Sequence, residues 1–236
     1  MSSPRKGRSL VRFTRRSIHY SRVDSVAVLG LGRFGAAVAL ELMNMGTDVL
    51  GIDANEDKVQ RLNGQLTHVV RADTTDEVAL AELNVHDFER VVVAIGSHLE
   101  ASILTASLVL QEGVDVWAKA TSFAHGRILE QLGVQHVIYP ETEMGKRVAH
   151  RVRGALLDFI ETGTDFALVR TKIPSELAGG TLDEDAVWNQ HKVKIVAVKS
   201  PSQGWIPVRS NTLLNDGDLV QVVGKTADVE TFATLL

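Results

Sequence analysis

The stretch SVAVLGLGRFGAAVALELMNMGTDVLGID, residues 25–53, limits most strongly what this chain can fold into. Gly30, Gly32 and Gly35 form a G-x-G-x-x-G pattern between a predicted strand and a predicted helix, and Asp53 ends the next predicted strand. In this context the pattern predicts a tight turn, a close approach of phosphates to the backbone, and a helix packed closely on its sheet.

The same turn predicts what binds there. The helix N-terminus offers free N–H groups to an anion, and Asp53 can accept hydrogen bonds from ribose hydroxyls. A carboxylate at that place disfavours a 2′-phosphate, so NADP is not expected. Arg33 lies inside the pattern and can pair with a terminal phosphate. The alternative for Arg33 is an ordinary surface position on the helix.

The residues up to 141 alternate strands and helices. Further strands are predicted at residues 68–73 and 90–96 and in the runs DVWAKA and HVIYP, with helices between them. The run VVVAIG is continuously apolar, as expected of a strand that is buried on both faces. This alternation predicts an α/β fold with a Rossmann-like, doubly wound parallel sheet over residues 24–141.

The pattern changes after residue 141. An amphipathic connecting helix is predicted over residues 142–162, with Met144, Val148, Leu156 and Phe159 on one apolar stripe. This stripe can close against either domain or against a second subunit. Residues 163–236 contain three strand-like runs and a closing helix, TADVETFATLL, and predict a small α+β domain.

Composition and charge exclude several classes of protein. The chain has no cysteine, which excludes disulfides, thiolate zinc sites and cysteine nucleophiles. Its apolar runs are too short to cross a bilayer and no secretory signal is found, so a cytoplasmic location is expected. Residues 1–23 form a basic extension on an acidic body. We expect this extension to be disordered and either merely solvated or docked on anionic lipid, nucleic acid or an acidic partner.

Further candidate contacts follow the predicted strands, because ligands of such folds bind at the carboxyl ends of the strands. The run ADTT at residues 72–75 follows the third strand, and Ala94, Ile95 and Gly96 follow the fourth. Lys119 and Glu141 end the fifth and sixth strands. For each of these two charges, simple solvation is the alternative.

The residues that an enzyme would need are missing from the sequence. The histidines have no metal-ligand spacing, and neither a nucleophile elbow nor a G-x-x-x-x-G-K-[ST] loop is present. A nucleotide sensor is therefore expected rather than an enzyme. The alternatives are a small NAD-dependent oxidoreductase and a nucleotide-responsive DNA-binding protein. The acidic body and the lack of a recognition helix argue against DNA binding, so no nucleic acid is expected.

With these residues, the chain resembles the cytosolic RCK proteins (regulators of conductance of potassium) of the KtrA/TrkA kind. The matching stretches are VLGLGRFG, GIDANEDKV, RADTTDE, VVVAIG, VWAKA and VIYPETEMGKRVA. The resemblance covers nearly everything after residue 24 and departs from the family in the run ADTT, in YPE and in the basic extension.

The resemblance implies a regulatory subunit in potassium uptake. Such proteins form homodimers that assemble into a gating ring, commonly an octamer, beneath a KtrB/TrkH-like membrane potassium-translocating subunit at the inner face of the membrane. Their implied ligands are ATP/ADP or NAD⁺/NADH, with a divalent cation as a further candidate. Some C-terminal domains of the family bind cyclic di-AMP, for which this sequence shows no deciding signature.

The resemblance also assigns the ligand contacts by matching positions. The residues implied along the phosphates are Gly30, Gly32, Arg33, Phe34 and Gly35. Those at the ribose are Asp53, Asn55 and Lys58, and those near the base are Asp73, Thr74 and Thr75. Lys119 and Glu141 are implied near the far phosphate or a bound cation, with Glu141 as the candidate metal ligand.

Overall fold

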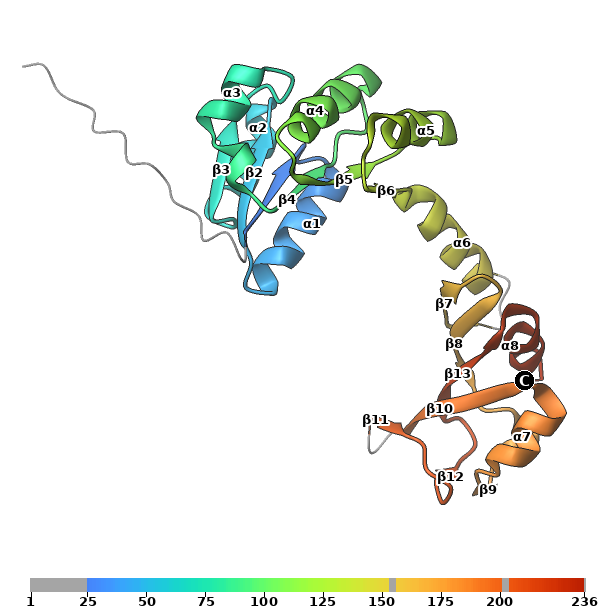
Figure 1. Cartoon of the computed structure of the whole chain (residues 1–236). Coiled ribbons are helices and arrows are strands. Elements are labelled where there is room, and N and C mark those ends of the chain that lie inside the picture. The colour runs from blue at the N-terminus through green and yellow to red at the C-terminus, as the bar shows by residue number, and fades with distance from the viewer. Residues whose placement is uncertain (1–24, 153–155, 201–203, 236) are drawn as a thin grey trace, which may run out of the picture. The chain divides into compact units, whose positions relative to one another are not determined.

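The computed structural model describes residues 25–152, 156–200 and 204–235 (Figure 1). The basic extension predicted at residues 1–23 lies outside the described residues. The chain divides into two compact units, Met1–Pro140 and Glu141–Leu236, which are described separately.

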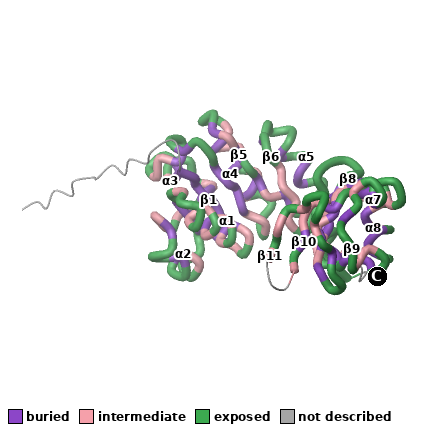
Figure 2. Tube along the Cα trace, turned by 90° about the horizontal axis from the view of Figure 1, so that it is seen from below, coloured by how far each residue is buried: buried purple, intermediate pink, exposed green. Residues whose placement is uncertain are grey.

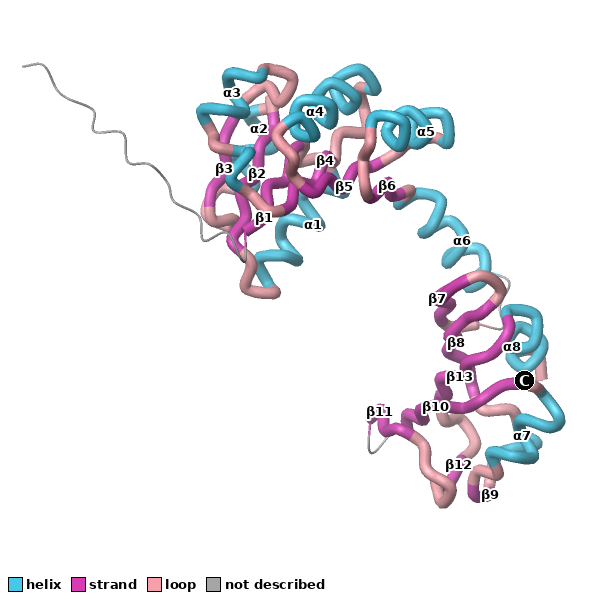
Figure 3. The backbone as a smooth tube through the Cα atoms, viewed as in Figure 1, coloured by secondary structure: helices cyan, strands magenta, loops and turns pink. Residues whose placement is uncertain are grey.

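The first unit alternates strands and helices, as predicted (Figure 3). Its elements are β1 (Ser25–Leu29), α1 (Arg33–Asn44), β2 (Asp48–Asp53), α2 (Glu56–Leu62), β3 (His68–Arg71), α3 (Glu77–Glu82), a 3-10 turn (Val85–Asp87), β4 (Arg90–Val93), α4 (Leu99–Gln111), β5 (Asp115–Lys119), α5 (Phe123–Leu132) and β6 (His136–Ile138).

The six strands form one sheet in the order β3-β2-β1-β4-β5-β6, and every neighbouring pair is parallel. The strand order reverses between β1 and β4, which is the point where ligands bind in open sheets of this kind. The predicted Rossmann-like sheet is therefore confirmed.

Both faces of this sheet are buried because successive side chains of a strand point to opposite sides. In β1, Ala27 and Leu29 pack into one apolar cluster, whereas Val26 and Val28 pack into another. The first cluster includes α4 and α5 residues and the second includes α1 residues, so the helices cover both faces (Figure 1). Buried residues accordingly follow the strands (Figure 2).

The second unit is a small antiparallel domain, which confirms the predicted α+β class. Its elements are α6 (Pro140–Val152), whose first residue belongs to the first unit, β7 (Asp158–Gly163), β8 (Phe166–Lys172), a 3-10 turn (Ser175–Leu177), β9 (Gly180–Thr181), α7 (Glu184–His191), β10 (Val193–Ser200), β11 (Gly204–Pro207), β12 (Leu213–Leu214), β13 (Leu219–Lys225) and α8 (Thr226–Ala233). Five strands form a sheet in the order β11-β10-β13-β8-β7, and β9 pairs with β12.

The connecting helix predicted over residues 142–162 extends too far. Helix α6 ends at Val152, and the segment from Asp158 forms strand β7, antiparallel to β8. Phe159 is buried while Ile160 is 43% exposed, so the side chains alternate with the period of a strand. Packing of Leu156 and Phe159 in the core of the second unit overrides the helical pattern.

Each helix in the described ranges is too short or too polar to cross a bilayer.

Candidate nucleotide-binding site

The glycine turn between β1 and α1 has the close contacts that its pattern predicts. Gly30 has a φ of +97°, which favours glycine, and its N–H donates to the Ile52 carbonyl at 2.8 Å. A Cβ on Gly35 would clash with the Gly30 carbonyl oxygen, so α1 packs directly on the turn. Gly32 differs, because a Cβ there would meet nothing within 4 Å. The side of the turn at Gly32 is therefore open to a ligand.

The N-terminus of α1 lies at this open side. Gly32 is the N-cap residue and supplies no side-chain cap, and the first turn of the helix contains no acidic residue. The first N–H groups of the helix are thus left for an anion, which the helix dipole also attracts. Arg33 is exposed at the first position of the helix, and Phe34 follows it half-buried.

Asp53 ends β2 next to the turn and holds it together. Its Oδ2 accepts from the Leu31 N–H at 2.7 Å and from Lys58 Nζ at 2.9 Å, and its Oδ1 accepts from the Asn55 N–H at 2.8 Å and from Lys58 Nζ at 3.2 Å. Burial by itself raises the pKa of Asp53, but the hydrogen bonds from Asn55, Lys58 and Leu31 outweigh it and lower the pKa. The carboxylate is therefore ionised at neutral pH.

This arrangement changes how Asp53 can bind a ribose. A carboxylate offers about four lone-pair directions, and the two N–H groups and the bidentate Lys58 ammonium use them. Ribose hydroxyls can bond to Asp53 only if Lys58 swings away or shares its place. Asn55 caps α2 by accepting from the Lys58 N–H at 3.2 Å, so Asn55 and Lys58 are coupled through that helix end.

The loop after β3 contains the three residues predicted near the base. Asp73 Oδ1 accepts from the Thr75 N–H at 2.9 Å and from Thr75 Oγ1 at 2.7 Å, and these two bonds lower the pKa of Asp73. Thr74 is buried, and its hydroxyl lies 2.9 Å from the hydroxyl of Thr105 in α4. The Thr74 side chain is thus directed into the protein. Thr105 was not found by sequence reasoning, since a threonine within a helix gives no signal of its own.

Lys119 joins the site from β5. Its Nζ lies 5.7 Å from the centre of the Phe34 ring, and a Cβ on Gly96 would lie 3.3 Å from the same Nζ. Ala94 and Ile95 line the underside of the turn, where they limit the space at Gly30. The structure therefore brings together α1, the loop after β4 and the end of β5 at one edge, with the positive charge of Lys119 beside the glycine turn.

Glu141, the candidate metal ligand, lies in the first turn of α6 at the start of the second unit. Glu141 therefore belongs to a different unit from the glycine turn. Within the ranges that the structure describes, no group of three or more His, Asp or Glu side chains is arranged to hold a metal ion. The cation assignment of Glu141 stays a prediction.

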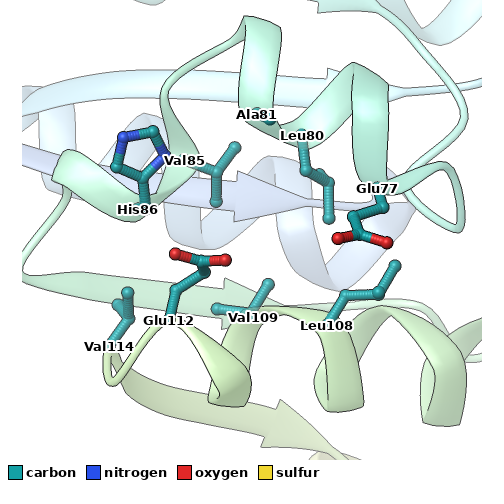
Figure 4. Close-up of a pocket in the computed structure, with 9 residues that line it drawn as sticks. All are labelled: Glu77, Leu80, Ala81, Val85, His86, Leu108, Val109, Glu112 and Val114. Atoms are coloured by element: carbon teal, nitrogen blue, oxygen red, sulfur yellow. The ribbon is translucent and has the colours of Figure 1, made fainter.

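A separate hollow of about 410 Å³, part of it open solvent, lies between α3 and α4 (Figure 4). Its lining residues are Glu77, Leu80, Ala81, Val85, His86, Leu108, Val109, Glu112 and Val114. Several of them precede β4 and β5, so the hollow lies toward the amino ends of these strands and away from the glycine turn. The hollow is therefore separate from the glycine turn.

Residues 26–140 match the TrkA-N domain family. The Ktr system potassium uptake protein C of Bacillus subtilis (strain 168) is 34% identical over 208 residues, covering 87% of this chain and 94% of that protein. The Ktr system potassium uptake protein A of Vibrio alginolyticus is 37% identical over 200 residues, covering 84% of this chain and 91% of that protein.

Solved structures agree with the fold. The GsuK RCK domain is similar with a TM-score of 0.62 at 18% identity, covering 94% of this chain and 50% of that one. The GsuK channel bound to NAD is similar with a TM-score of 0.60, also at 18% identity, covering 90% of this chain and 39% of that one. The chain thus spans half or less of these solved chains, and the likeness concerns the fold. Together with the curated relatives, it confirms the resemblance stated from sequence: the chain belongs to the TrkA-N/RCK family of Ktr potassium uptake proteins.

Proposed function

We propose that this chain is a nucleotide-sensing regulatory subunit that gates a membrane potassium channel or transporter. The observation that carries the proposal is the open glycine turn, with an uncapped α1 and an ionised Asp53 beside it, in a chain similar to named potassium uptake proteins. The ligand is an adenine nucleotide, either ATP/ADP or NAD⁺/NADH. A structural neighbour with this fold is described as a channel bound to NAD.

The contacts described above divide the site into three parts. The phosphates bind at Gly32 and the first N–H groups of α1, with Arg33 and Lys119 supplying positive charge. The ribose binds at Asp53 after Lys58 yields its place. The base lies over the loop from Asp73 to Thr75. A ligand bound this way changes the contacts of α1, α2 and α4 at once, which is what a sensor requires.

A regulatory role is favoured over the oxidoreductase alternative. The Bacillus and Vibrio relatives are named as potassium uptake proteins rather than as dehydrogenases. The positive charges and the uncapped helix N-terminus at the carboxyl edge of the sheet are suited to holding phosphates, which requires no chemistry. We therefore assign this chain no catalytic residue.

We further propose that the chain acts as an oligomer at the inner face of the membrane, with homodimers assembling into a ring under a KtrB/TrkH-like subunit. Met144, Val148 and Val152 form an exposed apolar stripe on α6, and this helix buries none of its residues. Phe123, at the start of α5, is also strongly exposed. Such apolar side chains are expected to be covered by other subunits. A cation at Glu141 and cyclic di-AMP in the second unit remain predictions from the resemblance.

The test compares nucleotide binding with potassium flux. We expect calorimetry to detect ATP, ADP or NADH binding by the full chain, and Gly35→Ala to abolish it through the clash with the Gly30 carbonyl. Gly145→Ala is the matched control, because a Cβ at Gly145 in α6 meets nothing within 4 Å. The same nucleotide should change potassium uptake in cells that also express the membrane subunit. A parent chain that binds none of these nucleotides, or binding without an effect on uptake, would overturn the proposal.

A further inference from the structure

The loop that follows β3 is held from two sides. On one side, the Ala72 N–H donates to the backbone carbonyl of Asp53 at 3.3 Å, which ties the loop to the residue expected to hold the ribose. On the other side, Thr74 contacts Thr105 in α4. Asp73, which is exposed, lies between Ala72 and Thr74, and it accepts hydrogen bonds from Thr75, which is half-buried and directly follows Thr74. The position of the loop relative to Asp53 is therefore set by a strand on one side and by a helix on the other.

Two hydrogen bonds join the loop to α4, and one placement of the two hydroxyl protons satisfies both of them. Thr105 Oγ1 donates to the Thr74 carbonyl at 3.1 Å, which leaves it free to accept from the Thr74 hydroxyl at 2.9 Å. Thr105 is fully buried and Thr74 nearly so. Water cannot easily replace either bond at this depth, so loss of one hydroxyl leaves the other group without a partner.

The loop has further contacts of its own, since the Asp76 N–H donates to the Asp73 carbonyl at 3.2 Å and Ala72 packs against the core of the first unit. Leu108 and Val109 lie one turn along α4 from Thr105, on the same side of the helix, and they line the hollow between α3 and α4. On the facing side, Leu80 and Ala81 of α3 line the same hollow (Figure 4). Helix α3 begins directly after the loop, and the hydroxyl pair joins the loop to α4 at the carboxyl edge of the sheet, whereas the hollow lies toward the amino ends of β4 and β5.

We propose that Thr105 is a positioning residue of the nucleotide site: through Thr74 it holds the loop of Asp73 and Thr75 at the place where the base is read. This inference rests on the proposed nucleotide-binding function. Thr105 touches no ligand itself. Its hydroxyl fixes the loop to α4, so the nucleotide base and α4 are mechanically linked.

The same helix provides a matched control. Ser102 lies three residues before Thr105 in α4 and is also fully buried, but its hydroxyl has no hydrogen-bond partner among the described residues. Removing the Ser102 hydroxyl therefore takes a buried polar group from α4 without touching the loop. Thr105→Val removes the hydroxyl and keeps the shape of the side chain, whereas Thr105→Ser keeps the hydroxyl.

The experiment measures the affinity of the full chain for ADP and for CDP, which differ only in the base. We expect the parent to prefer ADP, and Thr105→Val to bind ADP about 5- to 30-fold more weakly, as the loss of one or two buried hydrogen bonds predicts. CDP affinity should fall less, so the ADP/CDP ratio moves toward one. Thr105→Ser should restore the ratio, and Ser102→Ala should leave it unchanged. If Thr105→Val does not fold, Thr74→Ala breaks the same pair from the loop side.

The outcomes separate the inference from the function on which it rests. An unchanged ADP/CDP ratio in folded Thr105→Val, or a parent that binds both nucleotides equally, would overturn the positioning role but leave nucleotide binding intact. A lower thermal midpoint with an unchanged ratio would mean that the hydroxyl pair serves stability alone and would also overturn it. A parent that binds neither ADP nor any other nucleotide would overturn the proposed function and the inference together.

Discussion

Asp53 carries two roles that one set of substitutions can separate. Its carboxylate accepts from the Leu31 N–H of the glycine turn and is also the expected partner of the ribose. Asp53→Ala should therefore lower both the free energy of unfolding and the nucleotide affinity. Lys58→Met removes only the ion pair with Asp53, which is 2.9 Å long, and leaves the turn with its acceptor.

The expected magnitudes follow from burial. Leu31 is buried, so its N–H is left without a partner in Asp53→Ala, while water can reach the more exposed Asn55 N–H. Together these losses are expected to cost about 2–4 kcal/mol of stability. The Lys58 side chain is 32% exposed, so its ion pair is screened and Lys58→Met should cost only about 0–1 kcal/mol. For the nucleotide, each lost hydrogen bond to the charged acceptor should cost roughly 1.5–3 kcal/mol.

Denaturant unfolding followed by tryptophan fluorescence measures the first effect, and calorimetry with ATP, ADP and NADH measures the second. The hydrogen bonds lower the pKa of Asp53, so its stabilisation is present above the unfolded value of about 3.9 and is lost as the pH falls through the lower folded pKa. The difference between parent and Asp53→Asn should accordingly stay constant from pH 7 to about 4 and shrink in stronger acid. If Lys58→Met destabilises as much as Asp53→Ala, the ion pair and not the turn explains the role of Asp53. Unchanged affinity for all three nucleotides in Asp53→Ala would refute the ribose assignment.

Three further predictions concern the phosphates, the assembly and pH. Arg33→Ala should weaken ATP binding by about tenfold or more while ADP loses less, since the charge-assisted bond reaches the terminal phosphate; equal losses in titration calorimetry would mean that Arg33 only shapes the turn. Val148→Asp should dissociate the oligomer in light scattering, whereas Thr142→Asp, about 120° around α6 from Val148, should not; a monomeric parent would contradict the ring. Burial lowers the pKa of His125, so on acidification the unfolded chain takes up a proton at His125 before the folded chain does. The parent should therefore lose stability as the pH falls below about 6.5. His125→Asn should reduce this loss in urea unfolding, and an identical pH profile of stability in the variant would exclude His125 as its source.

The parts of the fold that depend on local pattern could be predicted from the sequence. The glycine spacing is dictated by backbone geometry, since Gly35 packs against the Gly30 carbonyl and Gly32 faces open space. The continuous apolar run in β4 requires burial on both faces, and its neighbours β1 and β5 are parallel to it. These signals lie within a few residues of each other in the chain, so no tertiary information is needed.

The second half of the predicted connecting helix shows where local pattern fails. Leu156, Phe159 and Ile160 follow Met144 and Val148 at helical spacing, yet the structure pairs Phe159 with Val169 of β8. Short apolar stretches fit a period of 3.6 and a period of 2 almost equally well, and the partner strand decides between them. That partner lies ten residues further along the chain and forms part of a core that the pattern of residues 142–162 does not contain.

The candidate site shows the same division between backbone and side chains. The sequence placed Asp53, Lys58 and Thr74 at the ligand, but it could not show that Lys58 already occupies the Asp53 carboxylate or that Thr74 points to Thr105. Both facts depend on which side chain reaches which lone pair across separate elements.

The contacts of Lys58 and Thr74 also bear on how such a site would sense its ligand. A nucleotide that binds Asp53 must displace the Lys58 ammonium or share the carboxylate with it, and one that contacts the loop at Thr74 also acts on the hydrogen bonds to α4. Binding is therefore expected to rearrange contacts on both sides of the sheet's central strands. A sensor needs such a structural change on ligand binding, and it requires no catalytic chemistry.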